Sequence, residues 1–288
     1  MADNYLVDYA ESGFYMMQGR LTAPENGRFQ CFPREQWRKE ILSTASVGLR
    51  GIEWIYDAYG EGANPLETLS GREELKTLLA DNHVSVVSIC ADYFMDYPFL
   101  RCTDAERAAR LERLSWLIGI CSELGIRRIV LPFVDASAIR SSEERDQVVT
   151  CLKQVLPVAE QKDIELHLET DLAPAAFRDL LQAINHPLVK VNYDSGNSSS
   201  LGYAPEAEFD AYGHWVGSVH IKDRVLGGKT VPLGQGDADF TALRKALIKA
   251  SYRGDFVLQV ARGVSGDELN WMRDVVMIAS GWLRGSTL

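Results

Sequence analysis

Short runs of β-forming residues alternate with longer amphipathic segments along this chain, and this alternation limits its possible folds more than any other feature. Eight strands are predicted, at residues 13–17, 51–54, 84–91, 128–133, 165–169, 189–193, 217–221 and 256–260. Helices are predicted between them, at residues 34–46, 72–81, 104–124, 142–161, 173–184, 204–211 and 240–251. Eight strand–helix repeats favour a closed parallel barrel over a doubly wound open sheet. The fold class is therefore α/β, and residues 1–288 are expected to form a single (β/α)8 TIM-barrel domain.

Length, charge and cysteine content fit this fold and exclude several classes of partner. The chain has 288 residues, against about 250 for a typical α/β barrel. Its net charge of −10 argues against a nucleic-acid partner, because binding to phosphate backbones depends on Lys and Arg. No apolar run approaches the ~20 residues of a membrane-spanning helix, and no signal peptide is visible. The five cysteines form no C-x-x-C pair, which indicates reduced thiols in a cytoplasmic protein. The net charge leaves a small-molecule partner open, including an anionic one.

Polar side chains stand at the ends of most predicted strands. In an α/β barrel the catalytic groups lie at the carboxyl ends of the strands, so these positions are candidate site residues. Residues 60–65 and 95–103 are expected to form longer loops over the mouth of the barrel. The strand-end residues are Gln18, Arg20, Glu53, Asp92, Glu169, Asp194, His220, Lys222 and Gln259.

Three of these residues have the character of metal ligands. Glu169 in LHLET, Asp194 in NYDSGN and His220 in SVHIKD each follow a short apolar run, and they are 25 and 26 residues apart. That spacing is about one strand–helix unit, so the three side chains are expected to converge at one rim of the barrel. Two carboxylates and an imidazole suit Mn²⁺ best, and also Mg²⁺, Co²⁺ or Zn²⁺. The alternative for each residue alone is a loop-capping carboxylate or a hydrogen-bonded histidine.

Several segments together resemble the xylose isomerase-like sugar (phosphate) isomerases and epimerases, and most closely the L-ribulose-5-phosphate 3-epimerases and tagatose/psicose 3-epimerases. The resembling segments are GLRGIEWI, IELHLET, VNYDSGNSSSLGY, SVHIKDR, VPLGQGDADF and YRGDFVLQVARG. The resemblance implies a metal held by a Glu, an Asp, a His and a second Glu, of which the first three correspond to Glu169, Asp194 and His220. It also implies a homodimer or homotetramer.

The fourth ligand departs from the family pattern, because this chain has Gln259 where the family has its second glutamate. A glutamine carbonyl still coordinates a hard cation, but it does not exchange a proton at neutral pH. The resemblance implies that two glutamates act on opposite faces of the substrate. Three consequences stay open: another residue supplies the second proton, the reaction needs only one carboxylate, or the activity is lost.

The remaining candidates have weaker signals. His167 shares a strand face with Glu169 and is a candidate proton relay or a buried structural histidine. Lys222 is the candidate to replace the missing acid or to polarise a carbonyl. Further candidates for substrate binding are the anion clamps Arg20, Arg224 and Arg262, the glycines Gly234 and Gly236 of a Gly-x-Gly loop, Glu53, and Asn197 at the mouth.

The function expected from these residues is a divalent-metal-dependent isomerase or epimerase of a sugar or sugar phosphate. Glu169 would remove a carbon-bound proton to give an enediolate. The alternatives are a metal-dependent lyase or dehydratase that uses a general acid such as Lys222, and an inert sugar-binding barrel. An endonuclease of the same fold is disfavoured, because it needs a histidine-rich multi-zinc site and this chain has only five histidines.

Overall fold

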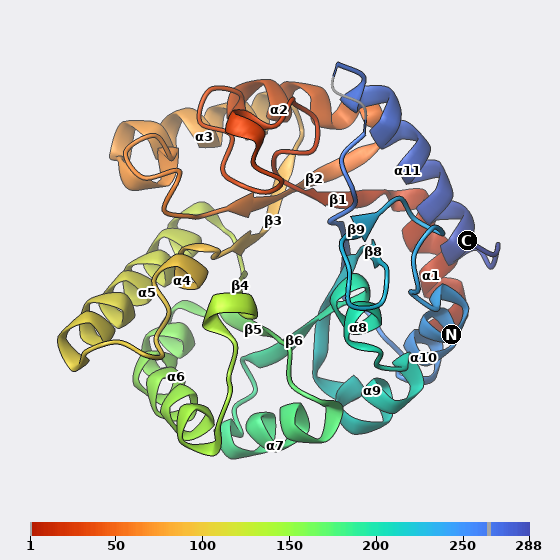
Figure 1. Ribbon diagram of the computed structural model, residues 1–288. Helices are drawn as coiled ribbons and strands as arrows, with labels where there is room; N and C mark the ends of the chain where they lie inside the picture. The colour runs from red at the N-terminus through yellow and green to blue at the C-terminus, as the bar shows by residue number, and fades with distance from the viewer. Residues whose placement is uncertain (1, 264–265) are drawn as a thin grey trace.

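A computed structural model describes residues 2–263 and 266–288, and its centre is a closed barrel of parallel strands (Figure 1). Neighbouring strands pair in chain order, and the last barrel strand closes the ring by pairing with β1. This arrangement confirms the predicted (β/α)8 barrel, and each predicted strand overlaps an observed one. The barrel strands are β1 (Phe14–Met17), β2 (Leu49–Ile55), β3 (Ser85–Cys90), β4 (Arg128–Phe133), β5 (Glu165–Thr170), β6 (Val189–Asp194), β7 (Val216–Ile221) and β10 (Asp255–Leu258).

Helices surround the barrel and overlap all seven predicted helical segments. The helix α5 has the predicted bounds, because Thr103 and Glu106 form a reciprocal capping box at its start and Gly125 ends it with a φ of 72°. In the described part of the chain, no helix has both the length and the apolar character needed to cross a membrane. These helices are α2 (Trp37–Thr44), α3 (Leu69–Asp81), α5 (Asp104–Leu124), α6 (Ser142–Lys162), α7 (Pro174–Ile184), α9 (Pro205–Tyr212) and α10 (Phe240–Lys249).

Two of the longer helices lie outside the predicted set. They are α1 (Ala2–Ser12), which precedes the first strand, and α11 (Glu268–Leu283), which follows the last one. They pack side by side against the outside of the barrel near the two chain termini (Figure 1). An isolated helix as short as α1 is marginal in water, so its formation depends on this packing and not on local sequence preference.

Short elements lie between the barrel strands and the outer helices. They include α4 (Tyr93–Asp96), α8 (Ser195–Leu201) and the antiparallel pair β8 (Asp223–Arg224) and β9 (Thr230–Val231). The 3₁₀ turns are η1 (Glu25–Gly27), η2 (Ala45–Val47), η3 (Pro65–Glu67), η4 (Asp135–Ser137) and η5 (Gly213–Trp215). Of the two expected mouth loops, 95–103 contributes Met95 and Asp96 to the central cavity, whereas no residue of 60–65 lines it.

The interior of the barrel is polar. Apolar residues of each strand, such as Leu168 and Val191, pack outward in one hydrophobic core shared with the helices. The single domain over residues 1–288 stays a prediction. Buried polar side chains of the barrel strands lie inside the ring; they are Glu53, Ser88, His167, Glu169, Asn192, Asp194, Ser218 and His220.

Candidate active site

A cavity of about 280 Å³ opens to solvent at the carboxyl ends of the barrel strands. This is the end at which α/β barrels carry their active sites. Its wall combines carboxylates, cations and amides, which is the composition of a site for a polar small molecule. The lining residues are Arg28, Phe29, Gln30, Cys90, Asp92, Met95, Asp96, Pro132, Val134, Asp135, Glu169, Asn197, Lys222, Arg224 and Gln259.

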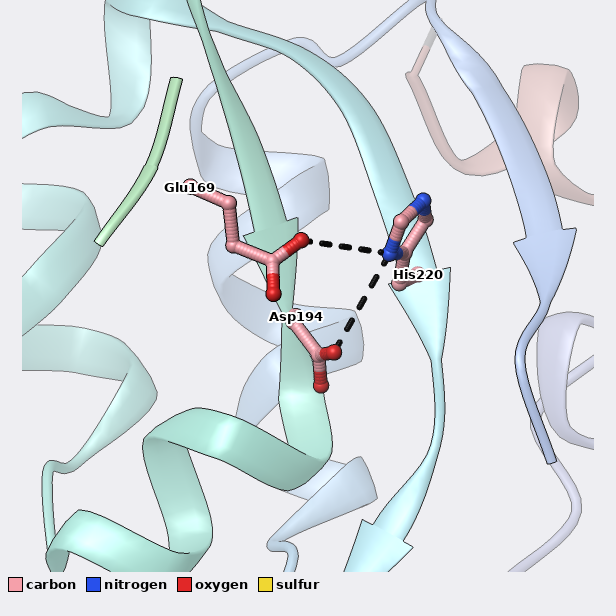
Figure 2. Close-up of side chains that lie close together, drawn as sticks. All are labelled: Glu169, Asp194 and His220. Atoms are coloured by element: carbon pink, nitrogen blue, oxygen red, sulfur yellow. Dashed lines mark ion pairs between the residues drawn. The ribbon is translucent and has the colours of Figure 1, made fainter. Parts of the chain in front are cut away.

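The three predicted metal ligands converge at the base of this cavity. Glu169 on β5, Asp194 at the end of β6 and His220 on β7 point toward one another (Figure 2). The Nδ1 atom of His220 lies 3.4 Å from Glu169 Oε2 and 4.0 Å from Asp194 Oδ2, and one ligand atom from each residue lies within 4.8 Å of the others. All three are buried, and only Glu169 lines the cavity.

Amide groups hold the two carboxylates in place. Glu169 accepts hydrogen bonds from Asn192 Nδ2 at 2.8 Å and from Asn197 Nδ2 at 2.6 Å, one on each oxygen. Asp194 Oδ1 accepts the backbone N–H groups of Gly196 and Asn197, at 2.8 and 2.9 Å, and so caps α8. Asp194 is therefore both a helix cap and a member of the triad, which combines the two alternatives that the sequence left open.

A third carboxylate, that of Glu53, lies against the other ring nitrogen of His220. The Nε2 atom of His220 lies 2.7 Å from Glu53 Oε1, and Ser88 donates a hydrogen bond of 2.5 Å to the other oxygen of Glu53. Burial disfavours the charged imidazole, yet Glu53 and Glu169 together raise the pKa of His220 well above its usual value. Glu53 is fully buried and absent from the cavity wall, so the structure places it against the histidine and not where it was expected to meet substrate.

This contact predicts a role for Glu53 in cation affinity. Replacing Glu53 by Gln keeps the side-chain volume but removes the charge that fixes the imidazole, so divalent-ion affinity should fall by about 10–100-fold. Titration calorimetry with Mn²⁺ measures the change. Asp135→Asn is the matched control, because it removes the same charge from the exposed rim of the cavity. Equal affinities for Glu53→Gln and the wild type would contradict the prediction.

Lys222 and Gln259 meet on the other side of the triad. The Lys222 ammonium donates to Asp194 Oδ2 at 3.1 Å, to Asn197 Oδ1 at 3.2 Å and to Gln259 Oε1 at 3.2 Å. The Lys222 stem passes so close to α8 that a Cβ at position 196 would lie 2.6 Å from its Cγ, which explains Gly196 in the NYDSGN segment. The carbonyl of Gln259 thus faces the triad side and has a cation as its present partner.

The predicted arginine clamps divide into two kinds. Arg224 lines the cavity and donates to Asn197 Oδ1 at 2.9 Å. Arg20 is buried and donates to the carbonyls of Val260 and Phe29, and Arg262 donates to the Phe29 carbonyl at 2.8 Å. Arg20 and Arg262 therefore hold the loop that carries Phe29. Phe29 lines the cavity, whereas the two arginines do not.

His167 lies deeper in the barrel than the triad. Its ring nitrogens are 2.7 Å from Ser218 Oγ and 2.9 Å from Glu165 Oε2, and it is fully buried. Burial lowers its pKa. Both nitrogens thus have protein partners, as in the structural alternative, and the histidine does not line the cavity.

The Gly-x-Gly loop is engaged by a carboxylate of the chain itself. The N–H groups of Gly234 and Gly236 each donate to Asp223 Oδ2 at 2.9 Å, and Ala238 N–H donates to Asp223 Oδ1. A Cβ at position 236 would lie 2.2 Å from Asp223 Oδ1, so this close approach needs a glycine. The expectation that these amides bind a substrate anion is therefore corrected, because they already have an anionic partner.

Of the residues that the structure brings into the site, Asn192, Gln30 and Arg28 are not among the sequence candidates, and Asp92 is among them without an assigned role. Asn192 had a usable signal, since it stands two residues before Asp194 and therefore on the same strand face. Asp92 was noted only as a strand end. Gln30 and Arg28 belong to the loop after β1, and no local pattern marks them as cavity residues.

Comparison with known proteins agrees with this geometry. The family model "Xylose isomerase-like TIM barrel" matches residues 42–275. An L-ribulose-5-phosphate 3-epimerase of Salmonella heidelberg is 27% identical over 235 residues, covering 78% of this chain and 82% of the relative. A D-psicose 3-epimerase of Clostridium cellulolyticum H10, solved with D-tagatose, has a TM-score of 0.72 at 14% identity, with 95% of this chain and 100% of that chain covered. The IOLI protein, solved with a bound zinc atom, has a TM-score of 0.74 at 16% identity and the same two coverages. The chain belongs to the xylose isomerase-like TIM barrel family.

Proposed function

We propose that this protein is a divalent-metal-dependent isomerase or epimerase that acts on a ketose or a ketose phosphate. The observation that carries the proposal is the convergence of Glu169, Asp194 and His220 at the base of a polar cavity, with Glu169 on the cavity wall. The 3-epimerase activity in the name of the Salmonella relative supports the reaction class. A small carbohydrate is the substrate class, since the wall offers both cations and hydrogen-bonding groups.

The residues present fit a divalent cation. Two carboxylates and the Nδ1 atom of His220 face a common point, and the carboxylate of Glu53 backs the imidazole, as is usual for metal-bound histidines. Gln259 is the proposed fourth ligand through Oε1. An ion bound there would act as a Lewis acid on neighbouring ketone and hydroxyl oxygens of the substrate. Mn²⁺ is the ion we favour for this donor set, and Mg²⁺, Co²⁺ and Zn²⁺ are alternatives.

The side chains around this point have distinct tasks in the proposed reaction. Glu169 removes the hydrogen on the carbon next to the ketone, because its carboxylate is the triad member that reaches the cavity. Asn192 and Asn197 hold that carboxylate in one orientation through their amide groups. The Lys222 ammonium stabilises negative charge that develops on the substrate oxygen as an enediolate forms.

One experiment separates the proposed reaction from its alternatives. The Mn²⁺-loaded protein is incubated in deuterated water with a panel of ketoses and ketose phosphates, and products are analysed by mass spectrometry and NMR. An isomeric product that carries solvent deuterium supports the proposal. A product lighter by one water indicates a lyase, and unchanged substrate across the whole panel indicates a barrel that only binds. The same panel decides whether the substrate needs a phosphate group.

The expected homodimer or homotetramer and the expected cytoplasmic location stay predictions.

A further inference from the structure

Asp92 is an acidic residue of the cavity wall that has no task in the reaction described so far. Asp92 follows β3, lines the cavity and is partly exposed to it. Its Oδ2 atom accepts a hydrogen bond of 2.8 Å from Gln30 Nε2, and its Oδ1 atom accepts one of 3.1 Å from the Cys90 thiol. It touches none of the three triad residues, so its carboxylate is available to a substrate in the cavity.

A chain of hydrogen bonds links this carboxylate to the position of the missing glutamate. Gln259 Nε2 donates to Gln30 Oε1 at 3.1 Å, and Gln30 in turn donates to Asp92. The orientation of Gln30 is fixed, because Arg20 Nη2 also donates to its Oε1 at 3.0 Å, which leaves only the amide nitrogen to face Asp92. At the other end, Gln259 Oε1 accepts from Lys222. On this wall, position 259 therefore carries a neutral amide that donates a hydrogen bond to Gln30, and position 92 carries the acidic group.

Inversion at carbon creates a need for such an acid. A proton must leave one face of the substrate and another must arrive on the opposite face, and Glu169 serves one face only. Among the other groups on the described cavity wall, the arginines stay charged and the Lys222 ammonium is bound to Asp194. Asp96 and Asp135 are exposed at the rim, where water surrounds them. Asp92 is the remaining carboxyl that packing shields from solvent.

We propose that Asp92 is the second proton-transfer residue of this site and does here what a carboxylate at position 259 would otherwise do. This inference rests on the proposed function. Glu169 takes the hydrogen as a proton, and the electron pair of the broken C–H bond moves onto the ketone oxygen. Asp92, in its acid form, gives its proton to the same carbon from the other face, and the C=O bond re-forms. Water in the open cavity then returns the proton from Glu169 to Asp92, so the cycle closes without an oxidant or a reductant.

The surroundings of Asp92 suit this exchange. Burial raises its pKa to about 6, with Asp57 and Glu169 acting in the same direction, while the hydrogen bonds from Gln30 and Cys90 lower it. A carboxyl group with a pKa near neutrality populates both its acid and its base form, which a residue that gives and takes a proton must do. The Cys90 thiol is less suited, because burial raises its pKa well above the usual value.

The test separates the two half-reactions. Asp92→Asn is assayed in deuterated water with the panel substrate that the wild type converts, starting from each epimer in turn. Epimer formation should fall by about 10²–10⁴-fold, the usual effect of losing a general acid–base group. Solvent deuterium should still enter the epimer whose hydrogen faces Glu169, and should no longer enter the other one. Asp171→Asn, which removes a partly buried carboxylate that does not line the cavity, is the matched control and should retain both activities.

A second variant tests the link to position 259. In the double variant Asp92→Asn, Gln259→Glu, a carboxylate stands just after β10, and epimer formation should recover at least in part.

Asp92→Ser gives an independent loss of the acid if the asparagine variant does not fold, as judged by circular dichroism. Full epimerisation by a folded Asp92 variant would overturn the role proposed for Asp92 and would leave the proposed function standing. Loss of exchange from both epimers, with metal content unchanged, would also overturn that role, since Asp92 would then only position other groups. A wild type that converts no panel substrate would overturn the proposed function and this inference with it.

Discussion

Replacing Glu169 by Gln is expected to abolish the exchange of the carbon-bound hydrogen with solvent deuterium in the epimer whose hydrogen faces Glu169, while the barrel stays folded. The substitution keeps the shape of the side chain and removes the only triad base that reaches the cavity. The rate should fall by at least about 10²–10⁴-fold. The new amide group would also face the Asn192 or Asn197 donor, so a modest loss of stability, about 1–3 kcal/mol, should accompany it. NMR of the substrate in deuterated water measures the exchange, and circular dichroism checks the fold.

The control for this variant is a carboxylate two residues further along the chain. Asp171 is partly buried and accepts the backbone N–H of Asp135, but it does not line the cavity, so Asp171→Asn should keep the exchange. Metal content must be measured in both variants, because Glu169 is also a proposed ligand. Persistent exchange in Glu169→Gln from the epimer assigned to Glu169 would show that another group is the base on that face, with Asp92 the first to examine, since both ring nitrogens of His167 are engaged by protein.

The second large effect concerns the ion itself. The purified wild type is expected to bind about one divalent ion per chain. Asp194→Ala is expected to bind almost none, because the proposed site loses one of its two carboxylate ligands. Removing Asp194 also leaves the Lys222 ammonium beside the site without its anionic partner, and that charge repels a cation. Elemental analysis of the dialysed proteins measures the stoichiometry.

A matched variant and a structural check complete this experiment. Asp96→Asn removes a carboxylate from the cavity rim without touching the triad, and should keep the full stoichiometry. Because Asp194 also caps α8, Asp194→Asn serves as a second variant that retains a capping oxygen while losing the charge. If the wild type and both Asp194 variants contain equally negligible amounts of metal, the proposed metal site is wrong.

Several parts of the site follow from local sequence. The strand pattern around Glu169, Asp194 and His220 places each side chain on the inner face of the barrel, because side chains alternate along a strand. Their spacing of about one strand–helix unit places them on adjacent strands, as β5, β6 and β7 are. The same reasoning applies to Asn192, which is two residues from Asp194 and was overlooked.

Other parts depend on contacts between residues far apart in the chain. Gln30 and Gln259 are 229 residues apart, and they meet only because β10 pairs with β1 and so closes the ring. The strand pattern predicts that Glu53 points inward. Whether its carboxylate contacts His220 or a substrate depends on how deep in the barrel that carboxylate lies. The amides of the Gly-x-Gly loop have Asp223 as partner, which no spacing rule indicates.

The sequence by itself determined the barrel and the convergence of Glu169, Asp194 and His220 at one rim, because each of these depends on periodicity or on residue identity. Only the tertiary structure decided which polar groups reach the cavity. Alternation along a strand fixes whether a side chain points inward, but not its height along the barrel axis or its partner from a distant loop. Those depend on the packing of the loops after β1, β3 and β7. That packing buries Glu53 against His220, engages the glycine amides with Asp223, and brings Asp92 onto the wall that Gln259 shares.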